Sequence, residues 1–183
     1  MEETLEAYDQ LVKQGKVRWI GASNLSPERL KASLAASEKY KYPLYRTLQP
    51  EYNLYDRENF EKHYRPVCLE HNLGVISYYS LASGFLTGKY RSEADLSKSS
   101  RGRGIKKYLN ERGFKILNAL DNVAAAHHTT PAGIAIAWLL HQPAVTAPIA
   151  SATSPEQFRV LTDACTLQLS EESRNMLNEA SAQ

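Results

Sequence analysis

Residues 16–30 read Lys-Val-Arg-Trp-Ile-Gly-Ala-Ser-Asn-Leu-Ser-Pro-Glu-Arg-Leu, which has the form of one strand, one polar turn and one helix. The apolar run 17–22 predicts a buried strand. Ser26 is typical of a helix cap, Pro27 fits the first helical position, and Glu28 suits the positive end of the helix dipole. The segment therefore predicts a βα unit whose turn carries small and polar residues.

The same order of strand, turn and capped helix recurs along the chain. Residues 149–158 read Ile-Ala-Ser-Ala-Thr-Ser-Pro-Glu-Gln-Phe and resemble residues 20–30. The other predicted strands lie at 45–50, 74–80 and 145–150. Helices are predicted at 3–14, 26–40, 56–72 and 109–126, and Pro66 predicts a kink or two short helices within 56–72. Thr130 is predicted to cap a helix over 134–140, and Ser154 and Ser170 are predicted to cap the last two helices. Strands that alternate with helices predict right-handed crossovers, a parallel sheet and an α/β fold. Residues 91–106 are polar and lack periodicity, which predicts a mobile loop, and we expect one domain over residues 1–183.

Composition excludes several classes of protein. The chain has 183 residues, 43% of them hydrophobic, and a formal net charge of +2. A charge so close to zero does not support a nucleic-acid partner or a polybasic membrane contact. No apolar run reaches the ~18–20 residues of a membrane span, and the acidic, amphipathic residues at the start of the sequence do not predict a signal or transit peptide. Cys68 and Cys165 provide no disulfide framework, so we expect free thiols in the cytoplasm.

Polar, uncharged side chains follow each predicted strand, where the ends of parallel strands meet at one edge of a sheet. These residues are Ser23 and Asn24, Gln49, Tyr79 and Ser80, followed by the backbone of Leu81, Ser83 and Gly84, and finally Ser151, Thr153, Ser154 and Gln157. Tyr79 offers a ring for stacking, Asn24 and Gln49 offer carboxamides, and the helix N-termini suit phosphate oxygens. The plainer interpretation is that polar turn residues follow every parallel strand. The sequence contains neither a GxGxxG nor a GxxxxGK[ST] motif.

The sequence also contains a basic segment and five histidines. The basic side chains are Lys98, Arg101, Arg103, Lys106 and Lys107. They either fold over a pyrophosphate or belong to a solvated loop. The histidines have no metal-ligand spacing, so we expect no metal site.

Four motifs, in order, resemble the aldo-keto reductases, and most closely the subgroup of bacterial reductases and potassium-channel β subunits. The motifs are Gly15-Lys-Val-Arg-Trp-Ile-Gly-Ala-Ser-Asn24, then Gln49-Pro-Glu-Tyr-Asn53 with Arg57, then Tyr79-Ser80-Leu81 followed by Gly84-Phe-Leu-Thr-Gly-Lys-Tyr90, and Thr153-Ser-Pro-Glu-Gln157. The resemblance covers essentially the whole chain. It implies the C-terminal half, about four βα units, of a (β/α)8 TIM-type barrel that binds NADP(H) without a Rossmann domain.

The resemblance also implies roles for individual residues. Ser23, Asn24 and Gln49 would hold the nicotinamide carboxamide, and Tyr79 would stack on the ring. The remaining implied cofactor contacts are Ser80, Leu81, Ser83, Gly84 and Leu86 at the pyrophosphate, Ser151–Gln157 at the 2′-phosphate, and Arg101 or Arg103 as a closing residue. Ser151 stands where the family often has a glycine or a lysine, and Gln157 stands where an arginine is common. Val160 and Leu161 stand where a Glu-Asn pair of the family usually contacts adenine. NAD is therefore not excluded as the cofactor.

No residue of this chain matches the family's catalytic tetrad of Asp, Tyr, Lys and His, so we expect no catalytic residue here. Three hypotheses remain: an NADP(H)-dependent oxidoreductase of aldehydes or ketones in half-barrel form, a non-catalytic nucleotide-binding or regulatory subunit, and a truncated relic. An open half-barrel exposes two sheet edges, so we also expect self-association or pairing with a missing half-barrel.

Overall fold

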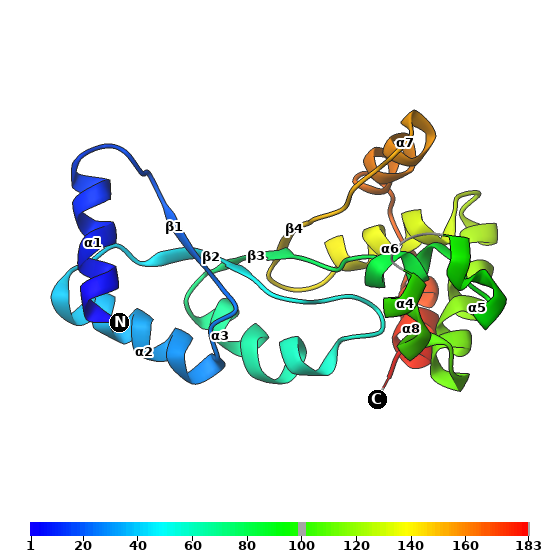
Figure 1. Cartoon of the computed structure of the whole chain (residues 1–183), viewed down its shortest axis with the longest axis horizontal. Helices are drawn as coiled ribbons and strands as arrows, with labels where there is room; N and C mark the ends of the chain where they lie inside the picture. The colour runs from blue at the N-terminus through cyan, green and yellow to red at the C-terminus, as the bar shows by residue number, and fades with distance from the viewer. Residues whose placement is uncertain (99–101, 183) are drawn as a thin grey trace.

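The computed structural model describes residues 1–98 and 102–182, in which one four-stranded sheet is flanked by helices (Figure 1). The strands are β1 (Ile20–Ser23), β2 (Tyr45–Gln49), β3 (Gly74–Ser77) and β4 (Val145–Pro148). The helices are α1 (Glu2–Lys13), α2 (Pro27–Tyr40), α3 (Arg65–Glu70), α4 (Gly102–Ile105), α5 (Glu111–Ala126), α6 (Pro131–Leu140), α7 (Pro155–Ala164) and α8 (Glu171–Ala180). Short helical turns occupy Phe60–Tyr64, Ala82–Thr87, Glu93–Lys98 and Lys106–Tyr108.

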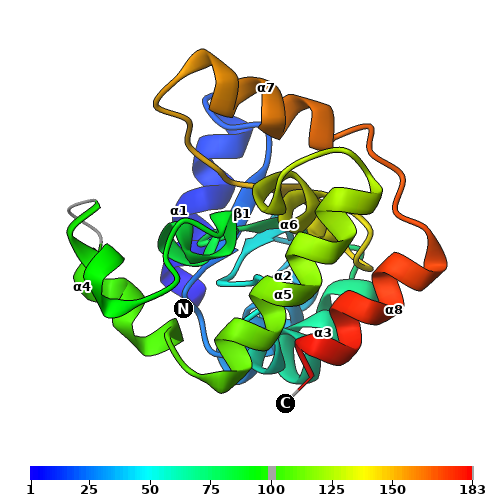
Figure 2. The ribbon, with the colours of Figure 1, turned by 90° about the vertical axis from the view of Figure 1, so that its right-hand side faces the viewer.

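The strands lie in the order β1-β2-β3-β4, and each neighbouring pair is parallel. Ser23 lies opposite Gln49, and Ser77 lies opposite Pro148, so the carboxyl ends of the strands share one edge of the sheet. Figure 2 shows the helices arranged around the strands. The α/β class and the parallel half-barrel sheet are thereby confirmed, and β1 and β4 are the two outer strands of the described sheet.

Local capping explains where the helices begin. The side chains of four predicted caps accept a hydrogen bond from a backbone N–H in the first helical turn, and a fifth residue does the same before α5. These caps are Ser26, Asn110, Thr130, Ser154 and Ser170. A cap of this kind stabilises a helix by about 1 kcal/mol. The turn chemistry visible in the sequence therefore sets the starts of α2, α6, α7 and α8.

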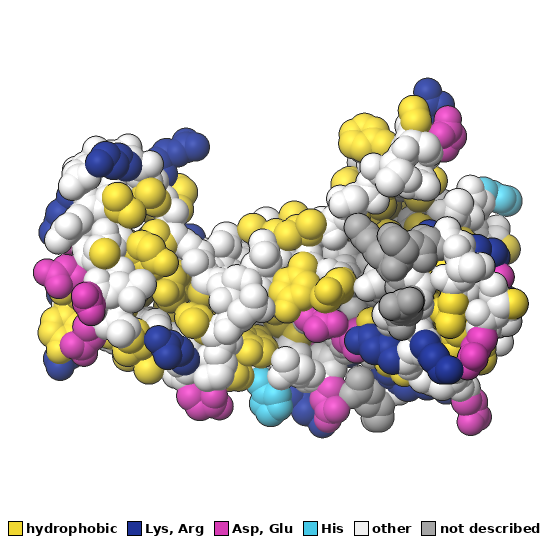
Figure 3. Space-filling view, viewed as in Figure 1, with side chains coloured by type: hydrophobic (Ala, Val, Ile, Leu, Met, Phe, Trp, Pro, Cys, Tyr) yellow, Lys and Arg dark blue, Asp and Glu magenta, His cyan; other side chains and the backbone are white. Residues whose placement is uncertain are grey.

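One face of the sheet is covered by helices and the other is open. Along β1, Ile20 and Ala22 are buried whereas Gly21 and Ser23 are exposed. A Cβ atom at Gly21 would lie 2.3 Å from Thr47 Oγ1, so the side chain of the neighbouring strand crosses this position. In Figure 3 the molecule is hollowed between its α1 end and α7, and hydrophobic side chains are exposed in the hollow.

The hydrophobic core extends from Leu5 of α1 and Leu30 and Leu34 of α2, past the sheet, to the C-terminal helices. Every residue of α6 from Gly133 to Leu139 is buried. The Trp138 ring lies 5.6 Å from the Tyr52 ring, which in turn lies 4.4 Å from Phe60. This aromatic cluster connects α6 to the segment that follows β2.

Several predicted boundaries were wrong. The strands predicted at 17–22, 74–80 and 145–150 are shorter in the structure, because pairing starts at Ile20 and stops at Ser77 and Pro148. The loop predicted over 91–106 contains the short helical segments Glu93–Lys98 and Gly102–Ile105. By contrast, the division into two short helices, one of the two outcomes expected near Pro66, is confirmed. A π-helical turn at Phe60–Tyr64 precedes α3, consistent with the hydrogen bond that proline cannot donate. Within the described residues, no helix is both long and apolar enough to cross a bilayer.

Candidate functional site

The carboxyl ends of β1 and β2 place two predicted site residues side by side. The Ser23 hydroxyl donates a hydrogen bond to the backbone carbonyl of Gln49, with an Oγ–O distance of 3.0 Å. Asn24 follows directly and has a left-handed backbone with φ of 55°. Asparagine is one of the few residues that tolerates this region. Ser23 and Asn24 are both exposed, and Gln49 is half-buried.

The end of β3 brings an aromatic ring to the same edge. Tyr79 has φ of 53° and is 54% exposed, unusual for so large a ring. The ring of Tyr78 lies 5.3 Å from the ring of Tyr79, and the Tyr78 hydroxyl donates a hydrogen bond to Asn24 Oδ1 at 3.1 Å. Asn24 and Tyr79 are therefore joined through Tyr78, a residue to which the sequence analysis assigned no role in the site.

Asn53 holds the backbone beneath the exposed ring. Its side chain is fully buried, and its Nδ2 donates to the Tyr79 carbonyl at 3.1 Å and to Asp56 Oδ2 at 3.3 Å. Its Oδ1 accepts hydrogen bonds from the backbone N–H groups of Tyr55 and Asp56. A buried amide with both ends satisfied rigidifies the segments that it joins. Asn53 belongs to the Gln-Pro-Glu-Tyr-Asn motif, which is the only signal in the sequence for this contact.

The turn after β3 contains residues with different surroundings. Ser80 is buried, and its hydroxyl donates to the Ser77 carbonyl at 3.1 Å. Leu86 is also fully buried, so the side chains of both residues face the protein interior. Leu81, Ser83 and Gly84 are half-buried. The backbone φ is 57° at Ser83 and 97° at Gly84. The surface available to a ligand on this turn is thus formed by Leu81, Ser83 and Gly84.

The segment after β4 is held by its own hydrogen bonds. Gln157 Oε1 accepts from the Thr153 N–H at 2.9 Å and from the Thr153 hydroxyl at 3.1 Å. Ser154 caps α7, and Ser151 is exposed. The N–H of Ile149 donates to the Ser77 carbonyl, which places the start of the segment beside β3. Because β2 and β3 stand between β1 and β4, Ser151 and Asn24 lie toward opposite ends of the row of strands.

The basic segment is partly paired with acidic residues. Lys98 Nζ lies 2.7 Å from Asp95 Oδ1, and Lys106 Nζ lies 3.1 Å from Glu93 Oε1. Arg101 and Arg103 were predicted to close over the cofactor. Arg101 lies outside the residues that the structure describes, and so does the side chain of Arg103.

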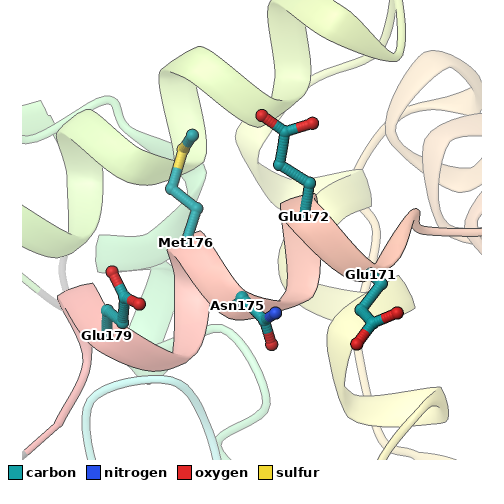
Figure 4. A pocket seen from close by; sticks show the side chains of 5 residues that line it. All are labelled: Glu171, Glu172, Asn175, Met176 and Glu179. Atoms are coloured by element: carbon teal, nitrogen blue, oxygen red, sulfur yellow. The ribbon is translucent and has the colours of Figure 1, made fainter.

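One hollow of the molecule lies away from this edge. It has a volume of about 520 Å³ and lies along α8, where Figure 4 shows its side chains on a single helix. It is lined by Glu171, Glu172, Asn175, Met176 and Glu179. Three carboxylates repel phosphate groups, so this hollow does not suit a dinucleotide. Residues 1–98 and 102–182 contain no group of three or more His, Cys, Asp or Glu side chains suited to a metal ion.

Comparisons with known proteins agree on one family. A model of the aldo/keto reductase family matches residues 1–182. An uncharacterized oxidoreductase YrpG of Bacillus subtilis is 31% identical over 179 residues, which cover 97% of this chain and 53% of that protein. The L-glyceraldehyde 3-phosphate reductase of Escherichia coli is 31% identical over 163 residues, 86% of this chain and 47% of that protein. The aldo-keto reductase yakc [NADP(+)] of Schizosaccharomyces pombe is 30% identical over 147 residues, 78% of this chain and 42% of that protein. The chain thus spans about half the length of these relatives.

Proposed function

The chain belongs to the aldo/keto reductase family, and on that premise we propose that the carboxyl edge of its sheet binds the nicotinamide end of NADP(H) for the reduction of aldehydes or ketones. The observation that carries this proposal is the joining of Asn24, Tyr78 and Tyr79 at one edge, next to the paired Ser23 and Gln49. In this assignment Asn24 and Gln49 recognise the carboxamide through complementary donors and acceptors.

The residues at the carboxyl edge of the sheet fit the nicotinamide end of a dinucleotide. The exposed ring of Tyr79 offers an apolar face for stacking on a flat heteroaromatic ring. Its backbone is held by the buried Asn53, so the ring starts from an ordered position and less freedom is lost on binding. Ser83 and Gly84, on the turn beside it, present small residues to which pyrophosphate oxygens can come close.

This chain provides residues for binding the nicotinamide, but not every group that the reduction of a carbonyl needs. The nicotinamide, when bound, supplies a hydride to a carbonyl carbon. Within this chain Ser23, Asn24 and Gln49 orient the ring, and Tyr79 covers one of its faces. No position matches the tetrad of the family, so we propose that this chain alone binds the cofactor without turnover.

The preference for NADP(H) rests on two observations. The segment 151–157 leads into the capped N-terminus of α7, and such helix starts favour phosphate groups. The printed name of the Schizosaccharomyces pombe relative includes NADP(+). Gln157 stands where an arginine is common in the family, and its Oε1 accepts hydrogen bonds from Thr153. Because an uncharged side chain attracts the 2′-phosphate less than an arginine does, binding of NADPH has to be compared with binding of NADH.

Isothermal titration of the chain with NADPH and NADH tests the proposal. We expect saturable binding of NADPH, and a loss of about two- to tenfold in affinity for Tyr79→Ala, since stacking on an aromatic ring contributes about 0.5–1.5 kcal/mol. Tyr40→Ala is the matched control, because this ring is also exposed, at 40%, but lies at the C-terminal end of α2, away from the proposed site. Absence of NADPH binding to the wild-type chain would refute the proposal.

Turnover is measured separately, as oxidation of NADPH in the presence of an aldehyde. We expect none from this chain. NADPH binding without turnover agrees both with a half-barrel that lacks the acid and with a nucleotide-binding subunit. Turnover by the purified chain would contradict the assignment of the acid to residues that are absent here.

We also propose that the open sheet pairs with a further half-barrel, either a second copy or a segment that carries the other four strands. β1 and β4 are the outer strands of the described sheet, and Trp19 and Ile149 beside them are 70% and 43% exposed. Unpaired strand edges and exposed apolar side chains favour association. The mass in solution tests this proposal and is treated in the Discussion.

A further inference from the structure

Two arginines from different parts of the chain hold residues 178–182, which are called the C-terminal strap below. Arg57, in the segment after β2, donates to the Asn178 carbonyl at 3.2 Å and to the Ser181 hydroxyl at 2.6 Å. Arg112, in the first turn of α5, donates to the Ser181 carbonyl at 2.8 Å. Ser181 is fully buried, so the strap is packed into the molecule at this residue.

Arg112 contacts the segment after β2 as well as the strap. The nitrogen that donates to Ser181 also donates to the Tyr55 carbonyl at 2.9 Å, and Nε donates to the Ala182 carbonyl at 3.4 Å. The guanidinium lies over the Tyr55 ring, 4.4 Å from its centroid. A guanidinium has five N–H donors in one plane, which allows Arg112 to join these carbonyl groups.

Tyr55 continues the contact toward the carboxyl edge of the sheet. Its N–H donates to Asn53 Oδ1 at 2.8 Å, and the Asp56 N–H donates to the same oxygen at 2.9 Å. Asn53 is fully buried. A continuous series of hydrogen bonds therefore runs from the strap, through Arg112, to residues 53–56.

The acceptors that hold Arg112 are uncharged. Within residues 1–98 and 102–182 no ion pair includes Arg112, whereas Arg57 pairs with Glu61. A carbonyl lacks the charge attraction that a carboxylate adds to a guanidinium. Opening of the strap at Arg112 therefore leaves no carboxylate without its partner, and local opening there costs less than at Arg57.

We infer that the C-terminal strap is a conformational latch. Its contact with Arg112 holds residues 53–56 in their ordered arrangement, and release of the strap loosens these residues while the rest of the fold stays intact. A coupling of this kind is reciprocal, so loosening of residues 53–56 also releases the strap. The latch requires no ligand and is independent of the proposed function.

Hydrogen exchange of single amides in the variant Arg112→Met tests the latch. Methionine keeps an apolar stem but donates no hydrogen bond. We expect the N–H groups of Tyr55 and Asp56 to exchange about tenfold faster, because their local opening no longer breaks the Arg112 contacts. The amides of α6, whose residues from Gly133 to Leu139 are all buried, are expected to keep their wild-type rates.

Lys115→Met is the matched control, since Lys115 is exposed on the same helix. We expect wild-type exchange rates in this variant, both at residues 53–56 and in α6. A general effect of removing a cation from α5 would change the rates in both variants.

Ser181→Ala releases the strap while Arg112 is left in place. It removes the hydroxyl that accepts from Arg57 and donates to the Leu177 carbonyl at 2.6 Å. The amides of Tyr55 and Asp56 are again expected to exchange faster. In the double variant the acceleration is expected to be smaller than the product of the two single accelerations, because either change already opens the same latch.

Three results would overturn the latch. The first is wild-type exchange at Tyr55 and Asp56 in Arg112→Met. The second is equal acceleration at residues 53–56 and in α6, which indicates only a lower global stability. The third is a double variant whose acceleration equals the product of the single ones. If Arg112→Met does not fold, Ser181→Ala decides on the same two sets of amides.

Discussion

Arg57 Nε lies 2.8 Å from Glu61 Oε1, and both partners of this largely buried ion pair belong to the segment after β2, which Arg57 also connects to the C-terminal helix. Arg57 also donates to the Ser181 hydroxyl at 2.6 Å and to the Asn178 carbonyl at 3.2 Å. The Tyr52 hydroxyl donates to Glu61 Oε1 at 2.8 Å. The side chains of Arg57 and Glu61 are 15% and 20% exposed, so water replaces few of these contacts when one partner is removed.

The variant Arg57→Met is expected to lower the free energy of unfolding by about 2–3 kcal/mol, because it leaves Glu61 with fewer partners in a largely buried position. Lys62→Met is the matched control, since Lys62 pairs with Glu58 on the exposed surface. Its cost is expected to be under about 0.5 kcal/mol. Urea denaturation measures both values, and similar costs for the two variants would contradict the prediction.

The Glu61 carboxylate is expected to make the free energy of unfolding depend on pH. Burial alone would raise the pKa of Glu61, but hydrogen bonds from Arg57 and Tyr52 and the charges of Arg57 and Arg65 outweigh it and hold this pKa below the ordinary 4.5. A lowered folded-state pKa contributes stability above the unfolded pKa, and this stability is lost as the pH falls through the folded value.

Wild-type stability is therefore expected to fall more steeply from pH 5 to below pH 4 than that of Glu61→Gln, measured by urea denaturation at high salt. Glu58→Gln serves as the control, because its exposed pair with Lys62 is screened by salt. Parallel pH profiles for wild type and Glu61→Gln would show that Glu61 is not the group responsible.

Gly113, in the first turn of α5, has no room for a side chain. A Cβ atom there would lie 1.9 Å from the Tyr108 carbonyl oxygen and 3.0 Å from Phe85 Cζ. Gly113→Ala is expected to cost about 3 kcal/mol through overpacking, although alanine is the better helix former. Gly104→Ala is the control, because nothing lies within 4 Å of its Cβ position. Thermal denaturation is expected to show a large fall in Tm for the first variant and little change for the second.

Association through the sheet edge is expected to raise the mass of the wild-type chain in solution above that of one copy, as measured by light scattering after size exclusion. Ala147, exposed on β4, is the position at which to test this. Ala147→Lys adds a charge to the outer strand and is expected to reduce the mass toward one chain. Ala35→Lys, on the exposed surface of α2, is expected to leave the mass unchanged. A wild-type chain that stays monomeric without aggregation would contradict the pairing proposal.

Local patterns in the sequence account for most of the secondary structure. Ser26, Thr130, Ser154 and Ser170 cap the helices that they were predicted to cap, because a cap needs only residues within one turn. Strand ends were predicted less well. Pairing at the end of β3 stops before Tyr79, which has a left-handed backbone and whose carbonyl accepts a hydrogen bond from Asn53, 26 residues away.

The order of strands and helices, and with it the parallel sheet and its polar edge, follows from residues that are close neighbours in the chain, since hydrophobic periodicity and turn chemistry are short-range. Which side chains support that edge became visible only in three dimensions. Tyr78 and Asn24 lie 54 residues apart, and their hydrogen bond exists because parallel pairing brings the ends of β1 and β3 to one side of the sheet. A hydroxyl or a buried amide has no periodic signature of its own, so the roles of Tyr78 and Asn53 depended on packing between distant segments.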